Sequence, residues 1–299
     1  MFHLSTVFPP VGRLRRLPIT RDQAMLLMAA VNEIFLGLDT FLAHSISGSI
    51  RPYEWIPILF GPTAGVILLL AGLIALRRRP LATVLATLVF TASIVVGGLG
   101  AYFHIARAVL PSGPAGQQVV FDLFIWAPPV LGPLAFALVG ILGLSAAWIE
   151  SPPDSGILDM LGGRRWHLPY AKTQAYFYMV SLGTMIALIS SALDHARTQF
   201  ESPWVWAPVS AGVFAVVVAA VLGATDRPTR ADLATYTAAM FILILVGLVG
   251  AFLHIRLNLI GGDTLVLERF LRGAPVLAPM LFANMGMIGL IVLLDPTEE

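Results

Sequence analysis

The sequence predicts an all-α integral membrane protein with eight transmembrane helices, built as two tandem four-helix bundles related by a pseudo-two-fold axis along the membrane normal. Composition is the first indication, because 58% of the 299 residues are hydrophobic and 12% are charged, whereas soluble domains average about 25% charged residues. The mean hydropathy of +0.85 agrees. The second indication is a series of long apolar runs, and the third is an internal repeat.

The apolar runs are long enough for membrane crossing, which takes about 20 residues per helix. Short polar segments, many with glycine or proline, separate them. The transmembrane helices are expected at about 22–44, 55–76, 81–109, 128–149, 171–195, 204–224, 231–257 and 274–294.

The internal repeat relates the two halves of the chain. The stretch GGLGAYFHI at 97–105 returns as GLVGAFLHI at 247–255, which places two histidines 150 residues apart (254 − 104). PVLGPLAF at 129–136 likewise matches PVLAPMLF at 275–282. A further set matches at an offset of 151: His44, Trp55, Pro57 and Gly61 with His195, Trp206, Pro208 and Gly212. The expected parts are an N-terminal segment 1–21, a first repeat 22–150, a linker 151–170 and a second repeat 171–295.

The distribution of positive charge predicts the orientation. Twelve arginine or lysine residues lie on one side of the expected helices and six on the other, and the richer side of a membrane protein faces the cytoplasm. We therefore expect both termini in the cytoplasm of a multi-pass protein of the cell (inner) membrane. The first 20 residues lack an apolar core and a small-residue cleavage site, so we expect no removable signal peptide.

Several kinds of chemistry lack the residues they need. The chain has no cysteine, which excludes disulfides, iron–sulfur clusters and haem attached through CxxCH. It contains no nucleotide-binding fingerprint, no phosphate-binding loop and no serine or cysteine nucleophile arrangement. The net charge of +1 says nothing about nucleic acid, and no basic patch of the sequence is large enough to indicate it. His3 and His167 have no partner in the other half, so we interpret them as surface residues.

Four repeated histidines are the candidate cofactor ligands: His44, His104, His195 and His254. Each lies at the outer end of an odd-numbered helix. The first and third helices of a bundle are parallel and diagonal across its core, so each half brings two histidines to one depth. Such a pair suits axial ligation of the iron of haem b, and two sites follow. The alternative is that each histidine lies at the membrane interface and bonds to a loop or backbone carbonyl.

Small residues form a stripe below these histidines, as in Gly97, Gly100 and Ala101, repeated as Gly247, Gly250 and Ala251. The stripe leaves room for a flat ring, but it also permits close helix packing, which is the commoner use of small residues in membranes. We expect packing.

Charged residues near the histidines are further candidates. Glu33, Asp39 and Asp194 lie within or at the end of spans, and ionisable groups in a membrane are costly, so a proton path or a quinone site is the hypothesis. Arg107 and Arg256 follow two of the histidines and could hold haem propionates or a quinone head group. Surface ion pairs, including any with the matched acids Asp122 and Glu268, are the alternative that we favour. Four tryptophans are expected to form an outer aromatic belt: Trp55, Trp126, Trp204 and Trp206.

The function expected from these residues is that of a membrane subunit of a respiratory or redox complex. It would bind haem b and carry electrons between quinone and a partner protein docked on the outer face. The arrangement is similar to that of other four-helix b-type cytochromes, which is an analogy of architecture alone. The alternatives are a haem-free quinone-binding anchor, a structural or assembly subunit, a transporter, or a zinc or copper site. A transporter needs a polar pathway, and the mid-membrane residues are apolar apart from Glu33. We expect a subunit that does not catalyse a complete reaction alone.

Overall fold

The computed structural model describes residue 7 and the ranges 19–46, 48–75, 77–109, 125–126, 129–260 and 266–294. Most of the expected N-terminal segment lies outside these residues, as do His3, Asp122 and the segment 110–124.

Six helices in the described part of the chain are long and apolar enough to cross a membrane. They are α2 (Arg21–Ser45), α3 (Trp55–Ala75), α4 (Arg79–Val109), α7 (Lys172–Ala196), α8 (Trp206–Gly223) and α9 (Arg230–Leu259). Their bounds lie within two residues of the expected spans. The protein is therefore a mainly helical protein whose membrane location is supported by length and composition.

Two further apolar helices are shorter, α6 (Leu131–Ala147) and α11 (Leu277–Val292), with 17 and 16 residues. At 1.5 Å per residue they measure about 25 Å, less than the hydrocarbon thickness of about 30 Å. Each begins three residues after its expected start, because Pro129 and Pro275 precede the helix instead of forming its first turn.

Local sequence sets the starts of two long helices. Thr20 caps α2, since its hydroxyl accepts from the Gln23 backbone N–H while the Gln23 side chain accepts from the Thr20 N–H. Thr229 and Asp232 make the same reciprocal arrangement at α9. Such capping boxes satisfy backbone donors that have no partner within the helix.

A small antiparallel sheet occupies part of the expected linker, which the all-α class did not include. Its strands are β1 (Ile149–Glu150), β2 (Ile157–Asp159) and β3 (Arg165–His167), in the order β1-β2-β3. Gly162 and Gly163 lie in the turn between β2 and β3 with φ of 72° and 73°, a conformation that glycine adopts without steric cost. Strands of two or three residues are too short to leave a clear alternating pattern.

Four short helices complete the described elements. They are the 3-10 turns η2 (Pro52–Glu54), η3 (Leu161–Gly163) and η4 (Pro203–Val205), and the helix α10 (Leu267–Arg272). The turns η2 and η4 lead directly into α3 and α8, and each carries proline at its first position.

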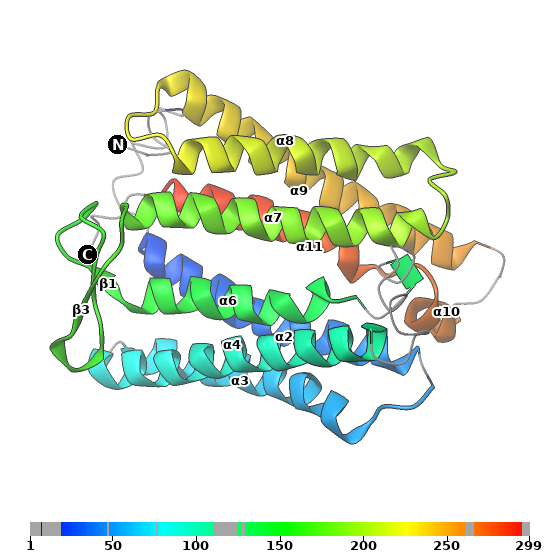
Figure 1. Ribbon diagram of the computed structural model, residues 1–299, viewed down its shortest axis with the longest axis horizontal. Helices are drawn as coiled ribbons and strands as arrows, with labels where there is room; N and C mark the ends of the chain where they lie inside the picture. Colours follow the sequence, from blue (N-terminus) through cyan, green and yellow to red (C-terminus); the bar gives the residue numbers. More distant parts are fainter. Residues whose placement is uncertain are drawn as a thin grey trace.

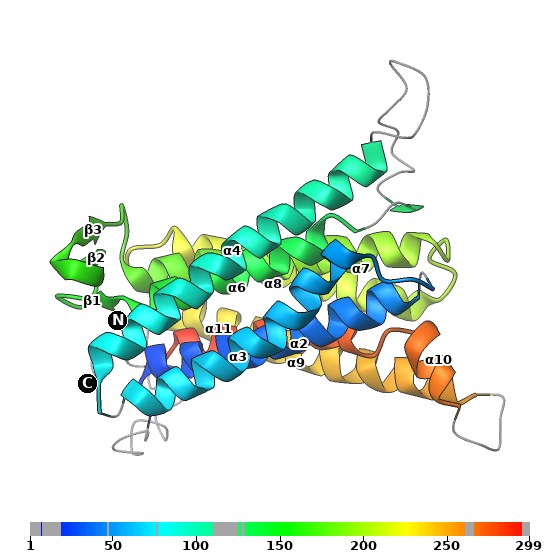
Figure 2. The same ribbon diagram turned by 90° about the horizontal axis from the view of Figure 1, so that it is seen from below.

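Each half of the chain packs as a ring of four helices, and the two halves form the lower and the upper group of helices in Figure 1. In the first half α2 packs on α3, α3 on α4, α4 on α6 and α6 on α2, so α2 and α4 lie diagonally. In the second half α7, α8, α9 and α11 pack in the same cyclic order, with α7 and α9 diagonal. Figure 2 shows α4 running obliquely along its bundle.

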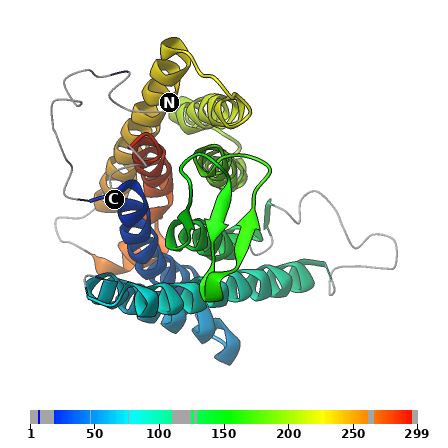
Figure 3. The same cartoon turned by 90° about the vertical axis from the view of Figure 1, so that its left-hand side faces the viewer.

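The two halves meet along four helices. The first and last helix of each half form this contact, α2 against α11 and α6 against α7, as the end-on view of Figure 3 shows. Apolar side chains fill the interior, the largest being Tyr176, Tyr236, Phe90 and Phe136. Large apolar residues are also exposed along the outside, such as Leu73 (66%) and Leu245 (62%). A helix bundle that is apolar both inside and outside is suited to a bilayer.

Polar residues join the two halves where α2 and α7 begin. Asp22 accepts from Lys172 Nζ at 2.5 Å and from the Tyr176 hydroxyl at 3.0 Å, while Arg21 donates to Thr173 Oγ1 at 2.6 Å. Lys172, the sole lysine of the sequence, is fully buried, and Arg21 is 2% exposed. These contacts tie α2 to α7 and define the inter-half ion cluster: Arg21, Asp22, Lys172, Thr173 and Tyr176.

Candidate cofactor site

Two histidine side chains of the first half lie next to each other. His44 is in the last turn of α2 and His104 lies five residues before the end of α4. Their ring centroids are 6.1 Å apart, with an angle of 59° between the ring planes. These residues form the first histidine pair, and both side chains are half-buried.

The second half places its two histidines in the same way. His195 is in the last turn of α7 and His254 lies five residues before the end of α9. The ring centroids of this second histidine pair are 6.5 Å apart, and the ring planes are 84° apart. Each pair therefore joins the two diagonal helices of its own bundle at the end away from the sheet.

Backbone carbonyls hold one nitrogen of three of these rings. His104 Nδ1 lies 2.8 Å from the Pro129 oxygen, His254 Nδ1 lies 2.8 Å from the Pro275 oxygen, and His44 Nδ1 lies 2.8 Å from the Thr40 oxygen. A carbonyl only accepts, so Nδ1 carries the proton and Nε2 keeps its lone pair. A carbonyl on the far nitrogen is the usual arrangement behind a metal-binding histidine.

The separation of the rings indicates the geometry that a bound metal ion would have. With a metal–nitrogen bond of about 2.0 Å and about 1.1 Å from nitrogen to ring centre, imidazoles on opposite sides of an ion have centroids about 6.2 Å apart, against about 5 Å for a tetrahedral angle. The observed 6.1 and 6.5 Å are compatible with the linear arrangement, and they also lie in the range of about 4.5–7 Å that is usual for neighbouring rings. Among the described residues no group of three or more His, Cys, Asp or Glu side chains could hold one metal ion.

The small residues below the histidines serve helix packing. A Cβ on Gly97 would lie 2.5 Å from the Ala137 nitrogen and 2.9 Å from the Pro133 oxygen of α6. A Cβ on Gly247 would lie 2.5 Å from the Ala283 nitrogen of α11. The last helix of each half therefore fills the space beside this stripe, which agrees with the expectation of packing and leaves no slot for a flat ring there.

Glu33 lies in the core of the first bundle. Its side chain is fully buried, and its Oε1 lies 2.5 Å from Ser93 Oγ, which is 2.8 Å from the Phe136 backbone oxygen. A serine hydroxyl has one proton, which Ser93 can donate to the Phe136 oxygen. The contact with Glu33 is then also a hydrogen bond when Glu33 is protonated and donates to Ser93 Oγ. Oε2 has no hydrogen-bond partner in the described part of the protein.

Glu33 lies apart from the other two acidic candidates, whereas Asp39 lies within electrostatic range of Asp194. Asp39, on α2, lines a cavity between the two halves, whereas Glu33 is enclosed within the first half. Asp194 is 51% exposed at the end of α7, with one carboxylate oxygen 3.9 Å from Arg197 Nη1. The structure thus places Glu33 alone in the first bundle and brings Asp39 and Asp194 near each other.

The arginines after the histidines are exposed. Arg107 Nη1 lies 3.8 Å from Glu54 Oε1, and Arg256 is also solvent-accessible. Glu268 pairs with Arg272 within α10 at 3.4 Å, while Asp122 lies outside the described residues. Ion pairing of Arg107 with Glu54, which the sequence did not indicate, agrees with the surface-pair alternative.

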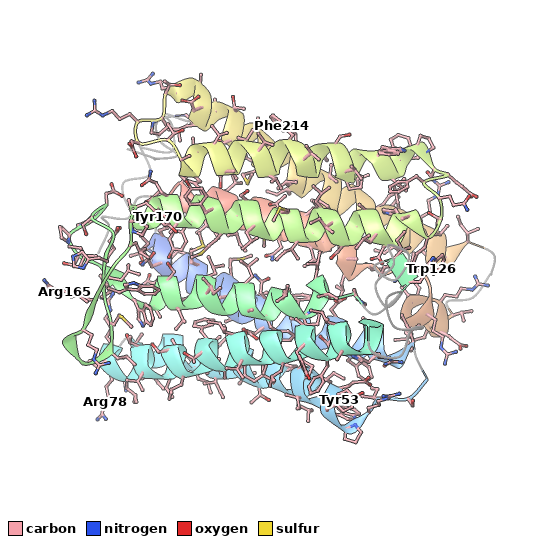
Figure 4. The ribbon with its side chains drawn as sticks, viewed as in Figure 1. Tyr53, Arg78, Trp126, Arg165, Tyr170 and Phe214 are labelled. Atoms are coloured by element: carbon pink, nitrogen blue, oxygen red, sulfur yellow. The ribbon has the colours of Figure 1, made fainter. Side chains whose placement is uncertain are left out.

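Aromatic and basic side chains lie at both ends of the molecule (Figure 4). Tyr53 and Trp126 are at the end that carries the histidine pairs, and Arg78 and Arg165 are at the sheet end. The four belt tryptophans are 40% to 71% exposed, and His167 is exposed on β3 as expected.

Two features were missed from the sequence. The inter-half ion cluster contains Lys172, which entered the sequence analysis only as one of the twelve positive charges that predict the orientation. Its signal was the alignment of Arg21 with Lys172 at the same offset of 151 (172 − 21) that relates His44 to His195. The cavity between the halves left no signal, because a void depends on the shapes of four helices.

Comparison with known proteins found no match, whether with protein-family models, with curated proteins or with solved structures.

Proposed function

We propose that this protein is the membrane subunit of a respiratory or redox complex, with b-type haem between the histidines of each pair, and that it carries electrons between a quinone and a partner protein. One observation carries the proposal: both halves bring two imidazoles together at the spacing that a linear nitrogen–metal–nitrogen arrangement needs, 6.1 and 6.5 Å between centroids. A six-coordinate b haem takes two axial ligands from the protein, and the histidine pair of each half would supply them.

The residues of the chain have separate roles in this proposal. His44 and His104 would ligate one iron and His195 and His254 the other, each through Nε2. Carbonyl oxygens such as those of Pro129 and Pro275 orient the rings and increase the basicity of Nε2. Haem, when bound, supplies reversible one-electron transfer. The glycine stripes are filled by α6 and α11 and would not hold the haem. The exposed Arg256, and Arg107 beside its partner Glu54, are the basic residues near the histidines that would pair with propionates.

The proposed membrane arrangement is eight spans in two duplicated halves. Equivalent packing supports it: Gly140 lies against Phe90 and Ile94 as Gly286 lies against Met240 and Ile244. The shorter helices α6 and α11 would span the membrane in one of two ways. Either the bilayer is thinner around them, or the residues before each helix also lie within the membrane. By charge, the sheet end faces the cytoplasm with both termini, and the partner docks over the histidine end. Since the chain lacks cysteine, labelling a single introduced cysteine from each side of the cell membrane tests this orientation.

Two alternative functions remain proposals beside this one. A haem-free quinone-binding anchor is favoured by the cavity between the halves, which a scaffold does not need. A structural or assembly subunit is favoured by the packing role of the glycine stripes. The haem content of the purified protein separates both from an electron carrier.

The test is a dithionite-reduced minus oxidised visible spectrum of the full-length protein purified in detergent, with the haem per chain determined. Six-coordinate b haem at two per chain is expected. His104→Ala and His254→Ala should each remove about half of the haem, and the double variant nearly all of it. His167→Ala, at an exposed histidine on β3, is the matched control and should keep all the haem. A flat spectrum, or full haem content in both single variants, would overturn the proposal.

A further inference from the structure

An apolar cavity of about 270 Å³ lies between the two halves. Its walls come from the four helices of the inter-half contact, α2, α6, α7 and α11. The lining is almost entirely aliphatic and includes five of the ten methionines of the chain: Met28, Met179, Met280, Met285 and Met287. Methionine is flexible and polarizable, and it adapts to ligands of irregular shape. We name this space the central cavity.

One residue of the lining of the central cavity carries a buried donor without a partner among the described residues. Asn32 lines it from α2 and is 8% exposed. Its Nδ2 has no hydrogen-bond partner among the residues that the structure describes. An unsatisfied buried donor costs about 1–3 kcal/mol, so a ligand with an acceptor oxygen would relieve it. Asp39 and Asn284 are the other polar residues of the lining.

We propose that the central cavity binds the ring of a lipophilic quinone, with Asn32 Nδ2 donating a hydrogen bond to one of the quinone carbonyl oxygens. This inference rests on the proposed function and identifies where the quinone binds. A quinone combines an apolar flat body, which the aliphatic walls accommodate, with the acceptor that Asn32 lacks. A hydrocarbon chain would fill the space but leave Asn32 Nδ2 unsatisfied.

The size of the cavity selects the same class of ligand. Sites for small molecules measure about 300–1,000 Å³, so a space of about 270 Å³ accepts a single substituted ring and excludes a porphyrin. The isoprenoid tail would leave between the helices into lipid. Asp39 lies seven residues after Asn32 on α2, about 10 Å further along the helix toward His44. The ring is thus placed on the interior side of the first histidine pair.

The test measures binding of decyl-substituted benzoquinone to the full-length protein in detergent, after bound lipids and quinones have been extracted and identified. Isothermal titration calorimetry gives the Kd. Asn32→Leu keeps a similar volume and removes the donor, so we expect roughly tenfold weaker binding. Val31→Trp places a large ring in the cavity and should abolish binding. Val217→Trp, at a side chain 54% exposed on α8, is the matched control and should leave the Kd unchanged.

Several outcomes would overturn this proposal. One is equal affinity in the wild type, Asn32→Leu and Val31→Trp. Another is extraction of phospholipid without quinone from a protein that does not bind the probe, which would assign the cavity to acyl chains. If no bound molecule is extracted and the probe does not bind, water alone would accept the hydrogen bond of Asn32 Nδ2. The haem spectrum is recorded on the same samples, so loss of quinone binding with intact haem refutes this inference alone, and quinone binding without haem refutes the haem proposal alone.

Discussion

Replacement of Lys172 by methionine tests whether the inter-half ion cluster holds the two halves together. Lys172 is fully buried, and its Nζ donates to Asp22 Oδ2 at 2.5 Å and to the Trp148 backbone oxygen at 2.8 Å. Lys172→Met keeps most of the volume but leaves both acceptors without this donor. The cation also lies 5.8 Å from the Tyr176 ring centroid, a further interaction that is lost.

The expected magnitude follows from the surroundings of Asp22. Removing one partner of a buried ion pair costs about 3–5 kcal/mol. Asp22 keeps the Tyr176 hydroxyl at 3.0 Å and Arg21 Nε at 3.6 Å, and it is 26% exposed. These contacts and water compensate part of its charge, so we expect Lys172→Met to lower the free energy of unfolding by about 3 kcal/mol, the lower end of that range.

A double-mutant cycle in detergent provides the assay. Unfolding by increasing denaturant is followed by circular dichroism for Lys172→Met, Asp22→Leu and the double variant. Because an apolar pair can replace a buried ion pair at little cost, the double variant should be at least about 1 kcal/mol more stable than the sum of the single changes predicts. The matched control is Glu268→Gln, which breaks the exposed pair with Arg272 and should cost less than about 0.5 kcal/mol. Equal, small effects at the buried and exposed pairs would refute the reasoning.

Two further predictions concern the first bundle. Gly97→Leu should strongly lower stability or abolish folding, because the new side chain meets the α6 backbone. Gly98→Leu should be tolerated, because no atom lies within 4 Å of a Cβ at that position. Equal yields and melting temperatures of the two variants would contradict the packing argument. Glu33→Gln should stay within about 1 kcal/mol of the wild type, because an amide also donates to Ser93. Glu33→Ala should lower the free energy of unfolding by about 2–4 kcal/mol, because it leaves a cavity. The same unfolding assay measures both variants, and equal losses of stability in Glu33→Gln and Glu33→Ala would contradict the prediction.

The helices were predictable because bilayer crossing imposes a simple rule on composition. Apolar runs located the six long helices within two residues, and the repeat indicated that His44 and His104, and likewise His195 and His254, lie at one depth. The exact starts of α6 and α11 were not predictable, since proline suits both the residue before a helix and its first turn. The three short strands carried too few residues for a periodic pattern.

The candidate site was only partly visible in the sequence. The repeat identified the histidines. Their hydrogen bonds to the carbonyl oxygens of Pro129 and Pro275 depend on the path of a loop backbone, which the sequence does not indicate. Lys172 was expected to be exposed, because ionisable residues at the start of an apolar run usually face water. Its burial arises from the contact between the halves, which no single helix encodes. The central cavity likewise arises from four helix faces that do not fill the space between them.

The differences between the two halves bear on how such a protein would use two similar histidine pairs. At the offset of 151, Asn32 corresponds to Gly183 and Glu33 to Thr184. Asn32 and Gly183 both line the central cavity, and a Cβ on Gly183 would lie 2.5 Å from Met285 Sδ. The cavity therefore has an amide donor on the α2 side and a close apolar contact on the α7 side. A ring held by Asn32 lies asymmetrically, and the buried Glu33 of the first half has no acidic counterpart at the matching position Thr184 of the second half. In the proposed function the first half would accordingly exchange electrons with quinone and the second with the partner protein.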